Sequence, residues 1–287
     1  MDCLGIRKIM YLCSMKMMWY CMKMVLVAVV MMAAAGGVGA QEASPQRALT
    51  AIEAMPRQQA LGEMSKWLDS SAKAGGKGYK KLIASLEEML SEPTWDTHNE
   101  ELFALAMEHA ATAPCLSDNE RLRPLMLLEV VRKNAPGTAC HDIDYETLDG
   151  NRRKLSEIAT PYTLIFFNDP ECLSCAKVKM RLDTCTLLRN MVADSTLTVL
   201  GIYPYDNTRE WKLEPFPGYM INGWDYKQEI EGEQSYDLMT MPLFYLVDRE
   251  KRVILKNEAS LNRVLKSLAR LKGLEESSIE EKLDALW

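Results

Sequence analysis

The sequence has 287 residues, of which 48% are hydrophobic and 26% are charged, and this composition is that of a globular protein. Its length is enough for one large domain or two modest ones. The net charge of −6 argues against a nucleic-acid partner.

The first predicted element is a signal peptide within residues 1–40. Met22–Ala40 begins with a short charged segment, continues with the apolar run Val25–Met32 and ends in small residues. This pattern predicts export to the periplasm or cell envelope of a bacterium, with cleavage before Gln41. Met22 is a second candidate for the start of translation. The alternative is an uncleaved membrane anchor, because the apolar stretch is nearly long enough to span a bilayer.

Residues 41–135 are predicted to form an all-helical domain. Gly and Pro residues separate four segments with helical apolar spacing, Arg47–Leu68, Tyr79–Leu90, Asn99–Ala113 and Asn119–Lys133. Neither His98 nor His109 has a second metal ligand at helical spacing. Both are therefore interpreted as surface or hydrogen-bonded histidines, and no catalytic constellation is predicted in this domain.

A Cys-x-x-Cys motif follows the first strongly apolar run of the next domain. The run Tyr162–Phe167 predicts a strand buried on both faces. Asn168, Asp169 and Pro170 interrupt it, and Cys172 and Cys175 then open a predicted helix. A strand, a short loop, a Cys-x-x-Cys pair and a helix in this order are typical of redox chemistry.

Cys172 is predicted to be the nucleophile and Cys175 the resolving thiol. A thiolate carries out disulfide exchange, and the N-terminus of a helix favours the thiolate. Cys175, one helical turn later, can reach back to resolve a mixed disulfide. The alternatives are two small buried hydrophobic residues or half of a zinc site. Zinc needs two more ligands, and the adjacent Cys140 and His141 do not form a usual pair.

Signal-peptide cleavage would remove three of the eight cysteines and leave an odd number, so at least one thiol is unpaired. Cys185 is predicted to be an inert core thiol on one continuous helical stripe, Val178, Leu182, Cys185, Leu188 and Val192. A disulfide between Cys115 and Cys140 is not expected. The predicted helix between them keeps its ends about 20 Å apart, whereas a disulfide needs Cα atoms within about 7 Å.

The remaining elements alternate between strands and helices. Residues 206–236 form an aromatic-rich insertion, which is interpreted as packing its own small core, with a substrate groove as the alternative. The other expectations are a strand at Leu197–Tyr203, a hairpin return at Val253–Lys256, a helix over 261–271 and a short C-terminal helix opened by a capping box at Ser277 and Glu280.

Met241 and Pro242 precede a second buried strand pattern, Leu243–Asp248. Together with the Cys-x-x-Cys segment, this pattern resembles the thioredoxin fold. In that family a cis-proline opens the strand beside the cysteine pair. The resemblance implies that Pro242 is cis and that the Met241 backbone faces an incoming substrate chain, and a trans proline at a sheet edge is the alternative.

From Pro136 to Leu271 the sequence resembles the TlpA-like periplasmic thiol-disulfide proteins that carry a helical N-terminal domain of unknown function. Three features depart from that family. Glu171-Cys172-Leu173-Ser174-Cys175 replaces the usual Trp-Cys-Gly-Pro-Cys, Phe166 occupies the position of a buried acid, and Asp169 and Glu171 add negative charge beside the nucleophile. These departures leave the redox potential and the direction of electron flow open.

The predicted fold is therefore an α/β thioredoxin-like mixed sheet flanked by helices over residues 136–287, after a helical domain over 41–135. The predicted function is an exported thiol-disulfide oxidoreductase that acts on protein cysteines. It needs no cofactor, because a dithiol electron donor at or in the membrane supplies electrons, and its partners are cysteine-containing exported proteins. The alternatives are a non-catalytic binding module on the same fold and a thiol peroxidase. Related peroxidases carry Thr three residues before the reactive cysteine, where this chain has Asp169.

Overall fold

The structure is a computed structural model that describes residues 44–94, 97–238 and 240–274. Two compact units divide these residues. The first runs up to Leu125, apart from the loop at 92–94, and the second comprises that loop and the chain from Met126 onward. Each unit is described by itself below.

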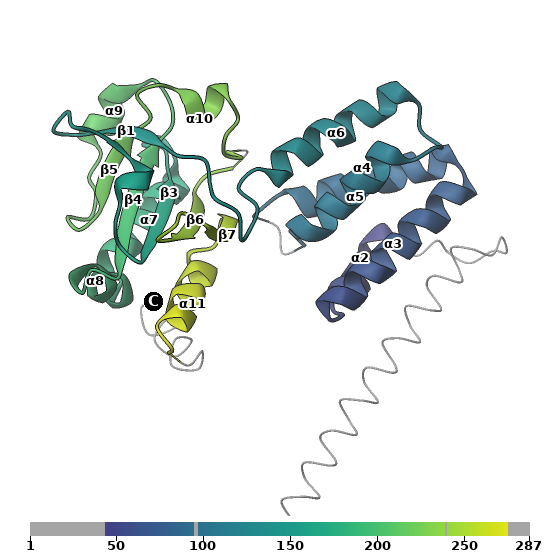
Figure 1. Cartoon of the computed structure of the whole chain (residues 1–287), viewed down its shortest axis with the longest axis horizontal. Coiled ribbons are helices and arrows are strands. Elements are labelled where there is room, and N and C mark those ends of the chain that lie inside the picture. The colour runs from purple at the N-terminus through teal and green to yellow at the C-terminus, as the bar shows by residue number, and fades with distance from the viewer. Residues whose placement is uncertain (1–43, 95–96, 239, 275–287) are drawn as a thin grey trace, which may run out of the picture. The chain divides into compact units, whose positions relative to one another are not determined.

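Helices build the first unit. They are α2 (Pro45–Glu53), α3 (Arg57–Ala74), α4 (Gly76–Ser91), α5 (Glu100–Thr112) and the beginning of α6 (Asp118–Arg132) (Figure 1). The prediction of one helix over Arg47–Leu68 is wrong, because α2 ends at Glu53 and α3 begins only after Pro56. A proline lacks the backbone donor that a helix interior needs, and it disfavours the α conformation of the preceding residue.

Both histidines of this unit have hydrogen-bond partners, as the sequence predicted. His109 accepts or donates at both ring nitrogens, with the Tyr79 hydroxyl at 2.6 Å and the Asp69 carboxylate at 3.1 Å. His98 Nδ1 lies 2.9 Å from the Leu90 carbonyl oxygen. Tyr79 itself is completely buried in the helical core, so the histidine satisfies a hydroxyl that burial would otherwise leave unpaired.

A seven-stranded mixed sheet forms the centre of the second unit, in the order β2-β1-β5-β4-β3-β6-β7. Its strands are β1 (Asp144–Thr147), β2 (Arg152–Lys154), β3 (Tyr162–Phe167), β4 (Leu197–Tyr203), β5 (Ile221–Trp224), β6 (Leu243–Asp248) and β7 (Val253–Glu258). β3 pairs in parallel with β4 and antiparallel with β6. The strand that precedes the cysteine motif therefore lies in the interior of the sheet, which explains its uninterrupted apolar sequence.

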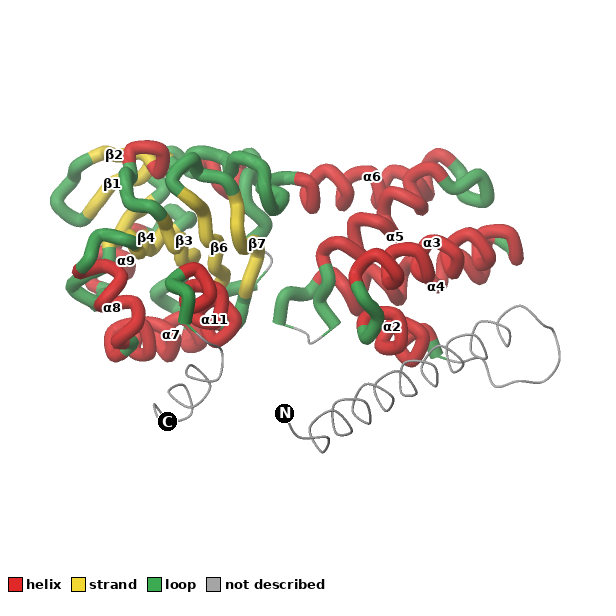
Figure 2. Tube along the Cα trace, turned by 60° about the horizontal axis from the view of Figure 1, so that its bottom comes forward, coloured by secondary structure: helices red, strands yellow, loops and turns green. Residues whose placement is uncertain are grey.

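Helices cover both faces of this sheet. The longer helices α7 (Leu173–Thr184), α8 (Thr186–Ala193) and α11 (Leu261–Leu271) pack on the face that carries Phe166 and Phe244, and Figure 2 shows them together along one side of the strands. The short elements η1 (Leu155–Glu157) and α10 (Glu229–Gly232) contribute to the core on the other face. The predicted mixed sheet flanked by helices is confirmed.

Two predictions in this unit need correction. The stripe through Cys185 is not one helix, because α7 ends at Thr184 and α8 begins at Thr186, although Cys185 is buried as predicted. The insertion packs partly on itself, because the centroid of the buried Trp211 ring lies 6.1 Å from that of the Trp224 ring and its Nε1–H donates a hydrogen bond to the Asn222 side chain, but it is also part of the main sheet. It supplies the short helix α9 (Thr208–Leu213) and β5, which joins the main sheet beside β4, and its Tyr219 hydroxyl donates a hydrogen bond to the Leu182 carbonyl of α7.

Some predicted features lie outside the described residues. They are the signal-peptide segment Met22–Ala40 and the capping box of Ser277 and Glu280. Within the described ranges, every helix is too short or too polar to cross a membrane.

Candidate active site

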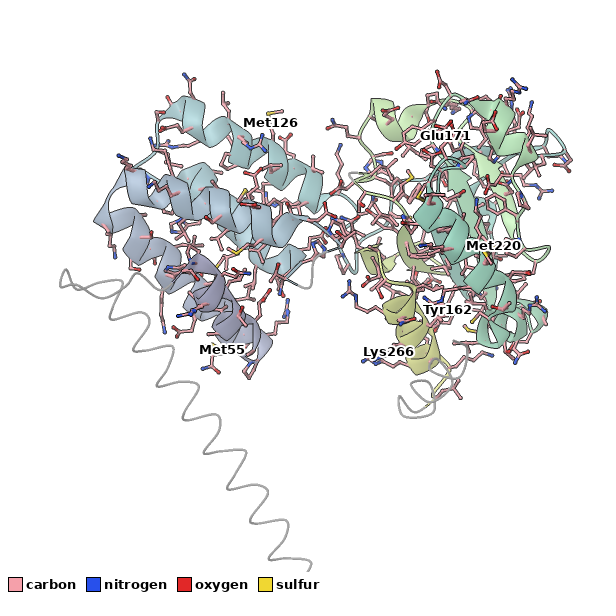
Figure 3. All side chains as sticks on the ribbon, turned by 180° about the vertical axis from the view of Figure 1, so that it is seen from behind. Met55, Met126, Tyr162, Glu171, Met220 and Lys266 are labelled. Carbon is pink, nitrogen blue, oxygen red and sulfur yellow. A yellow bond between two sulfur atoms is a disulfide. The ribbon has the colours of Figure 1, made fainter. Side chains whose placement is uncertain are left out.

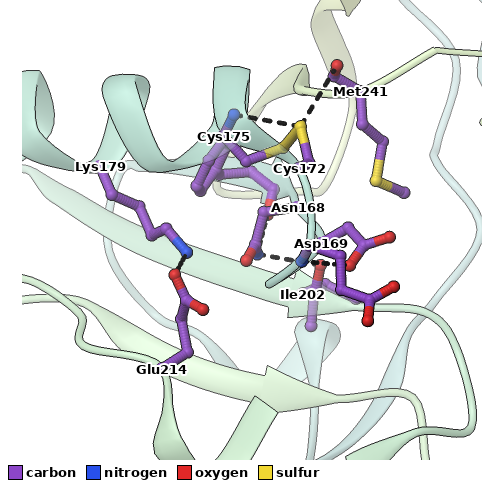
Figure 4. The surroundings of a disulfide bond; sticks show 10 residues. Asn168, Asp169, Cys172, Cys175, Lys179, Ile202, Glu214 and Met241 are labelled. Carbon is purple, nitrogen blue, oxygen red and sulfur yellow. Dashed lines mark hydrogen bonds and ion pairs between the residues drawn. A yellow bond between two sulfur atoms is a disulfide. The ribbon is translucent and has the colours of Figure 1, made fainter. Parts of the chain in front are cut away.

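Cys172 and Cys175 form a disulfide at the start of α7, with their Cα atoms 5.2 Å apart. β3 ends at Phe167, and the loop after it places Cys172 at the N-cap of the helix. The backbone N–H of Cys175 donates to the Cys172 sulfur over 3.1 Å (Figure 4). A sulfur in this position faces the unpaired amides of the first helical turn, which stabilise negative charge. The predicted pair is thus brought together in the predicted setting.

The two sulfurs differ in their access to solvent. Cys172 is half-buried, whereas Cys175 is completely buried against the core between the sheet and α7. An attacking group must reach its target, and a resolving group needs to reach only its partner. This arrangement therefore suits Cys172 to attack and Cys175 to resolve, which remain predictions about their roles.

The strand opened by Pro242 lies beside the disulfide. The Met241–Pro242 peptide bond is cis, as the resemblance implied. β6 begins at the next residue and pairs with β3 so that Leu243 lies opposite Phe167. The Met241 carbonyl oxygen is 3.7 Å from the Cys172 sulfur. That Met241 and Pro242 bind a substrate chain stays a prediction.

The residues that depart from the thioredoxin pattern have distinct positions. Phe166 is completely buried and stacks on Phe244, with ring centroids 5.0 Å apart, so its side chain supplies packing in place of an acid. Asp169 accepts a hydrogen bond from the Glu171 backbone N–H over 2.9 Å. Glu171 lies at the surface beside the start of α7 (Figure 3). Burial, followed by the charges of Asp169, Asp206 and Glu171, raises the pKa of Tyr203 to about 12.

Three polar residues behind the disulfide were missed from the sequence. Asn168 is completely buried, and its amide group donates to the carbonyl oxygens of Phe166 and Ile202. Lys179 of α7 is also buried and forms an ion pair with Glu214. One available signal was the position of Lys179, four residues after Cys175 and three before Leu182, on the apolar face of the helix.

The other three cysteines among the described residues are not paired with Cys172 or Cys175. Cys115, Cys140 and Cys185 are free. Burial is the main cause that raises the pKa of the Cys140 thiol. Across the described ranges, no group of three or more His, Cys, Asp or Glu side chains is arranged to hold a metal ion.

Comparison with known proteins finds similarity in solved structures. A thioredoxin-like protein from Bacteroides caccae is 28% identical, with a TM-score of 0.75 over 79% of this chain and 83% of that chain. A conserved protein of unknown function from Bacteroides fragilis is 36% identical over 47% of this chain and 98% of that chain, with a TM-score of 0.45. The thioredoxin domain of a thiol-disulfide oxidoreductase from Bacteroides vulgatus is 24% identical over 47% of this chain and 98% of that chain, with a TM-score of 0.38. No family model and no curated protein matches the sequence.

Proposed function

We propose that this chain, which is similar in structure to a thioredoxin-like protein, is an exported thiol-disulfide oxidoreductase acting on the cysteines of other exported proteins. One observation carries the proposal. A half-exposed Cys172 at a helix N-terminus is paired with a buried Cys175 and lies 3.7 Å from the Met241 carbonyl oxygen. A disulfide that served only stability would not need one sulfur at the surface.

The proposed reaction starts from the dithiol form. The Cys172 thiolate attacks a substrate disulfide, so a bond forms between Cys172 and one substrate sulfur while the other substrate sulfur leaves as a thiolate. Cys175 then loses its proton and attacks the Cys172 sulfur. The intramolecular disulfide forms, and the first substrate sulfur leaves. The substrate gains two electrons and the Cys172–Cys175 pair loses two, and a second dithiol protein returns them without a cofactor.

Met241 and Pro242 have a substrate-binding role in this proposal. An extended substrate segment beside Cys172 would meet the Met241 backbone before it met the rest of β6, because the Met241 carbonyl is the group next to the sulfur. Backbone recognition of this kind is tolerant of substrate sequence. It suits an enzyme that acts on many exported proteins.

The proposed location is the periplasm or cell envelope of a bacterium. The sequence pattern of Met22–Ala40 supports it. We expect N-terminal sequencing of the exported protein to begin at Gln41. Recovery of a chain that retains Met22–Ala40 would instead indicate an anchored protein.

Trapping of covalent intermediates tests the proposed function. Replacement Cys175→Ser removes the resolving thiol and leaves the attacking thiol. We expect this variant to accumulate mixed disulfides with exported cysteine-containing proteins, seen as high-mass bands that collapse when reductant is added. The matched control Cys172→Ser should trap none, because the remaining Cys175 is completely buried.

A binding module on the same fold is the competing function, and Phe166 in place of an acid favours it. It predicts a Cys172–Cys175 pair that never changes its redox state. Thiol alkylation of the protein in its native compartment, with and without reductant, separates the two functions. An oxidoreductase is contradicted if Cys175→Ser traps nothing and the wild-type pair is found in a single state.

A further inference from the structure

An ion pair is buried in the layer between α7 and the sheet, behind the disulfide. The Lys179 ammonium contacts the Glu214 carboxylate, and their side chains are only 6% and 13% exposed. Lys179 follows Cys175 by four residues on α7, and both side chains are buried. Residues at this spacing lie on the same face of a helix with their Cβ atoms about 5–6 Å apart. The lysine is therefore the charged side chain that follows Cys175 along the buried face of α7.

The chain segment after α9 holds this pair in place. Glu214 follows α9 directly, and two residues later the ring of Phe216 lies 5.0 Å beneath the Lys179 ammonium. Phe216 in turn fills the space above Gly201 of β4, where a Cβ atom would approach the ring to 2.6 Å. Gly201 lies opposite Phe166 in the sheet register. The lysine thus lies against a carboxylate and an aromatic face, and that aromatic ring packs on the strand next to β3.

Stability alone does not account for a charged pair in this position. Removing two charges from water costs several kcal/mol per ion, and apolar replacements of buried pairs are often neutral or stabilising. A second polar group lies close by, because Asn168 is completely buried directly after β3 and its amide oxygen has no hydrogen-bond partner. Figure 4 shows Asn168 beneath the disulfide, with Lys179 and Glu214 to one side. The core behind Cys175 therefore contains buried polar groups, although the other side chains that pack around Cys175 are apolar.

We propose that the Lys179–Glu214 pair sets the fraction of Cys175 that is ionised in the mixed-disulfide intermediate, and thereby the rate at which that intermediate is resolved. The ammonium on α7 favours a thiolate at Cys175 through its positive charge. Glu214 is the ion-pair partner of this ammonium and limits its field. Lys179 and Glu214 are positioning residues that act through Cys175, and this inference depends on the proposed oxidoreductase function.

The step concerned conserves atoms and electrons. The Cys175 thiol releases its proton to solvent, and the resulting thiolate attacks the Cys172 sulfur. A bond forms between the two protein sulfurs, the bond from Cys172 to the foreign sulfur breaks, and that sulfur departs as a thiolate. No other oxidant is needed, because the foreign disulfide has already supplied the oxidising equivalent.

An aromatic disulfide that releases thionitrobenzoate measures the two steps separately. Reduced protein should release one chromophore when Cys172 attacks and a second when Cys175 resolves. The test compares the wild-type protein with a neutral pair, Lys179→Met with Glu214→Gln, and a swapped pair, Lys179→Glu with Glu214→Lys. We expect the second phase near neutral pH to be slower in the neutral pair and slower again in the swapped pair, by roughly three- to tenfold at each step.

The swapped pair separates an electrostatic role from a structural one. A pair that serves only to hold α7 and the Glu214 segment together is retained in the swap, so a structural role predicts a swapped protein that behaves like wild type. The matched control is Lys177→Glu on the exposed side of the same helix, where solvent screening should keep the change below about twofold. The first phase is an internal control in every variant.

A measurement on the wild-type protein covers the case in which the swapped variant does not fold. Coupling between charges is reciprocal, so the NMR signal of the Lys179 side chain should shift at the pH at which Cys175 ionises in the dithiol form. It should not shift there in the disulfide form. A swapped protein with wild-type kinetics, or a Lys179 signal insensitive to the redox state, would overturn this inference. Absence of a second phase in the wild type would instead contradict the proposed function.

Discussion

Cys172 and Cys185 occupy equivalent positions on consecutive helices, yet their surroundings differ. Each is an N-cap residue with extended backbone, at φ −86° and ψ 108° for Cys172 and φ −72° and ψ 107° for Cys185. The Cys172 sulfur accepts a hydrogen bond from the Cys175 N–H, is partly exposed and forms a disulfide. Cys185 makes no capping hydrogen bond, is 5% exposed and is free. A helix N-terminus alone therefore does not make a cysteine a candidate for exchange.

The sheet accounts for this difference. Cys172 follows the carboxyl end of β3, where it is partly exposed and its sulfur lies 3.7 Å from the Met241 carbonyl oxygen. Cys185 lies at the other end of α7 and packs with Leu182, Leu188 and residues of α11 in the core cluster. The four predictions that follow test whether the reactivity of a cysteine depends on its position at a helix N-terminus or on its access to a reaction partner.

The largest expected effect is the loss of exchange in Cys172→Ser. The rate of disulfide exchange with a model peptide should fall by roughly a thousandfold or more, the scale on which removal of a nucleophile acts. Cys185→Ser should leave that rate unchanged while lowering the free energy of unfolding by about 1–3 kcal/mol, because a buried hydroxyl replaces a thiol. Kinetics and denaturant titration of both variants check this contrast. Comparable loss of exchange in Cys185→Ser would contradict it.

The next prediction opens the core around Cys185. Leu188 is completely buried in the same cluster, so Leu188→Ala should cost about 2–5 kcal/mol of unfolding free energy and increase alkylation of Cys185. Exchange activity should nevertheless remain at Cys172. If the variant also formed mixed disulfides through Cys185, access alone would be sufficient for exchange.

A third prediction uses Cys140, which is neither at the start of a helix nor fully buried. Burial is the first cause that raises the pKa of its thiol, partly offset by a hydrogen bond with Tyr236. Because only the thiolate reacts, alkylation of Cys140 should rise at a pH higher than that of an ordinary cysteine, with about tenfold less reaction for each unit by which the pKa is raised. Mass spectrometry of the protein alkylated at several pH values gives the profile. If Cys140 were alkylated at neutral pH as fast as an ordinary cysteine, burial would not raise the pKa of its thiol as expected.

The smallest expected effect concerns the acids beside Cys172. Asp169→Asn with Glu171→Gln removes negative charge that disfavours the thiolate, and should accelerate the attack of Cys172 by a few-fold, about the size expected for partly exposed charges. The redox potential should become more oxidising, since the reduced form is stabilised. Stopped-flow alkylation and a glutathione redox titration measure both quantities. Unchanged values would mean that solvent screens these side chains.

Much of the fold follows from local patterns in the sequence. The apolar run of β3, the loop after it and the Cys-x-x-Cys pair predicted the position of Cys172, and the pattern around Pro242 predicted the neighbouring strand. These elements depend on short-range conformational preferences and on a pattern of apolar residues that is visible within each segment. The thioredoxin-like fold that the family resemblance implied is confirmed by the sheet order and by the similarity to the Bacteroides caccae protein.

The tertiary structure decided the features that depend on contacts between distant segments. β5 has only four residues and becomes a strand because β4 and β1 pair with it on its two sides. The break at Cys185 was not visible in an apolar spacing that continues through it. Glu214 lies 35 residues from Lys179, so nothing local indicated that the lysine is buried with a partner. A sequence determines which side chains avoid water, but the enclosure of a charge depends on which remote segment the fold places against it.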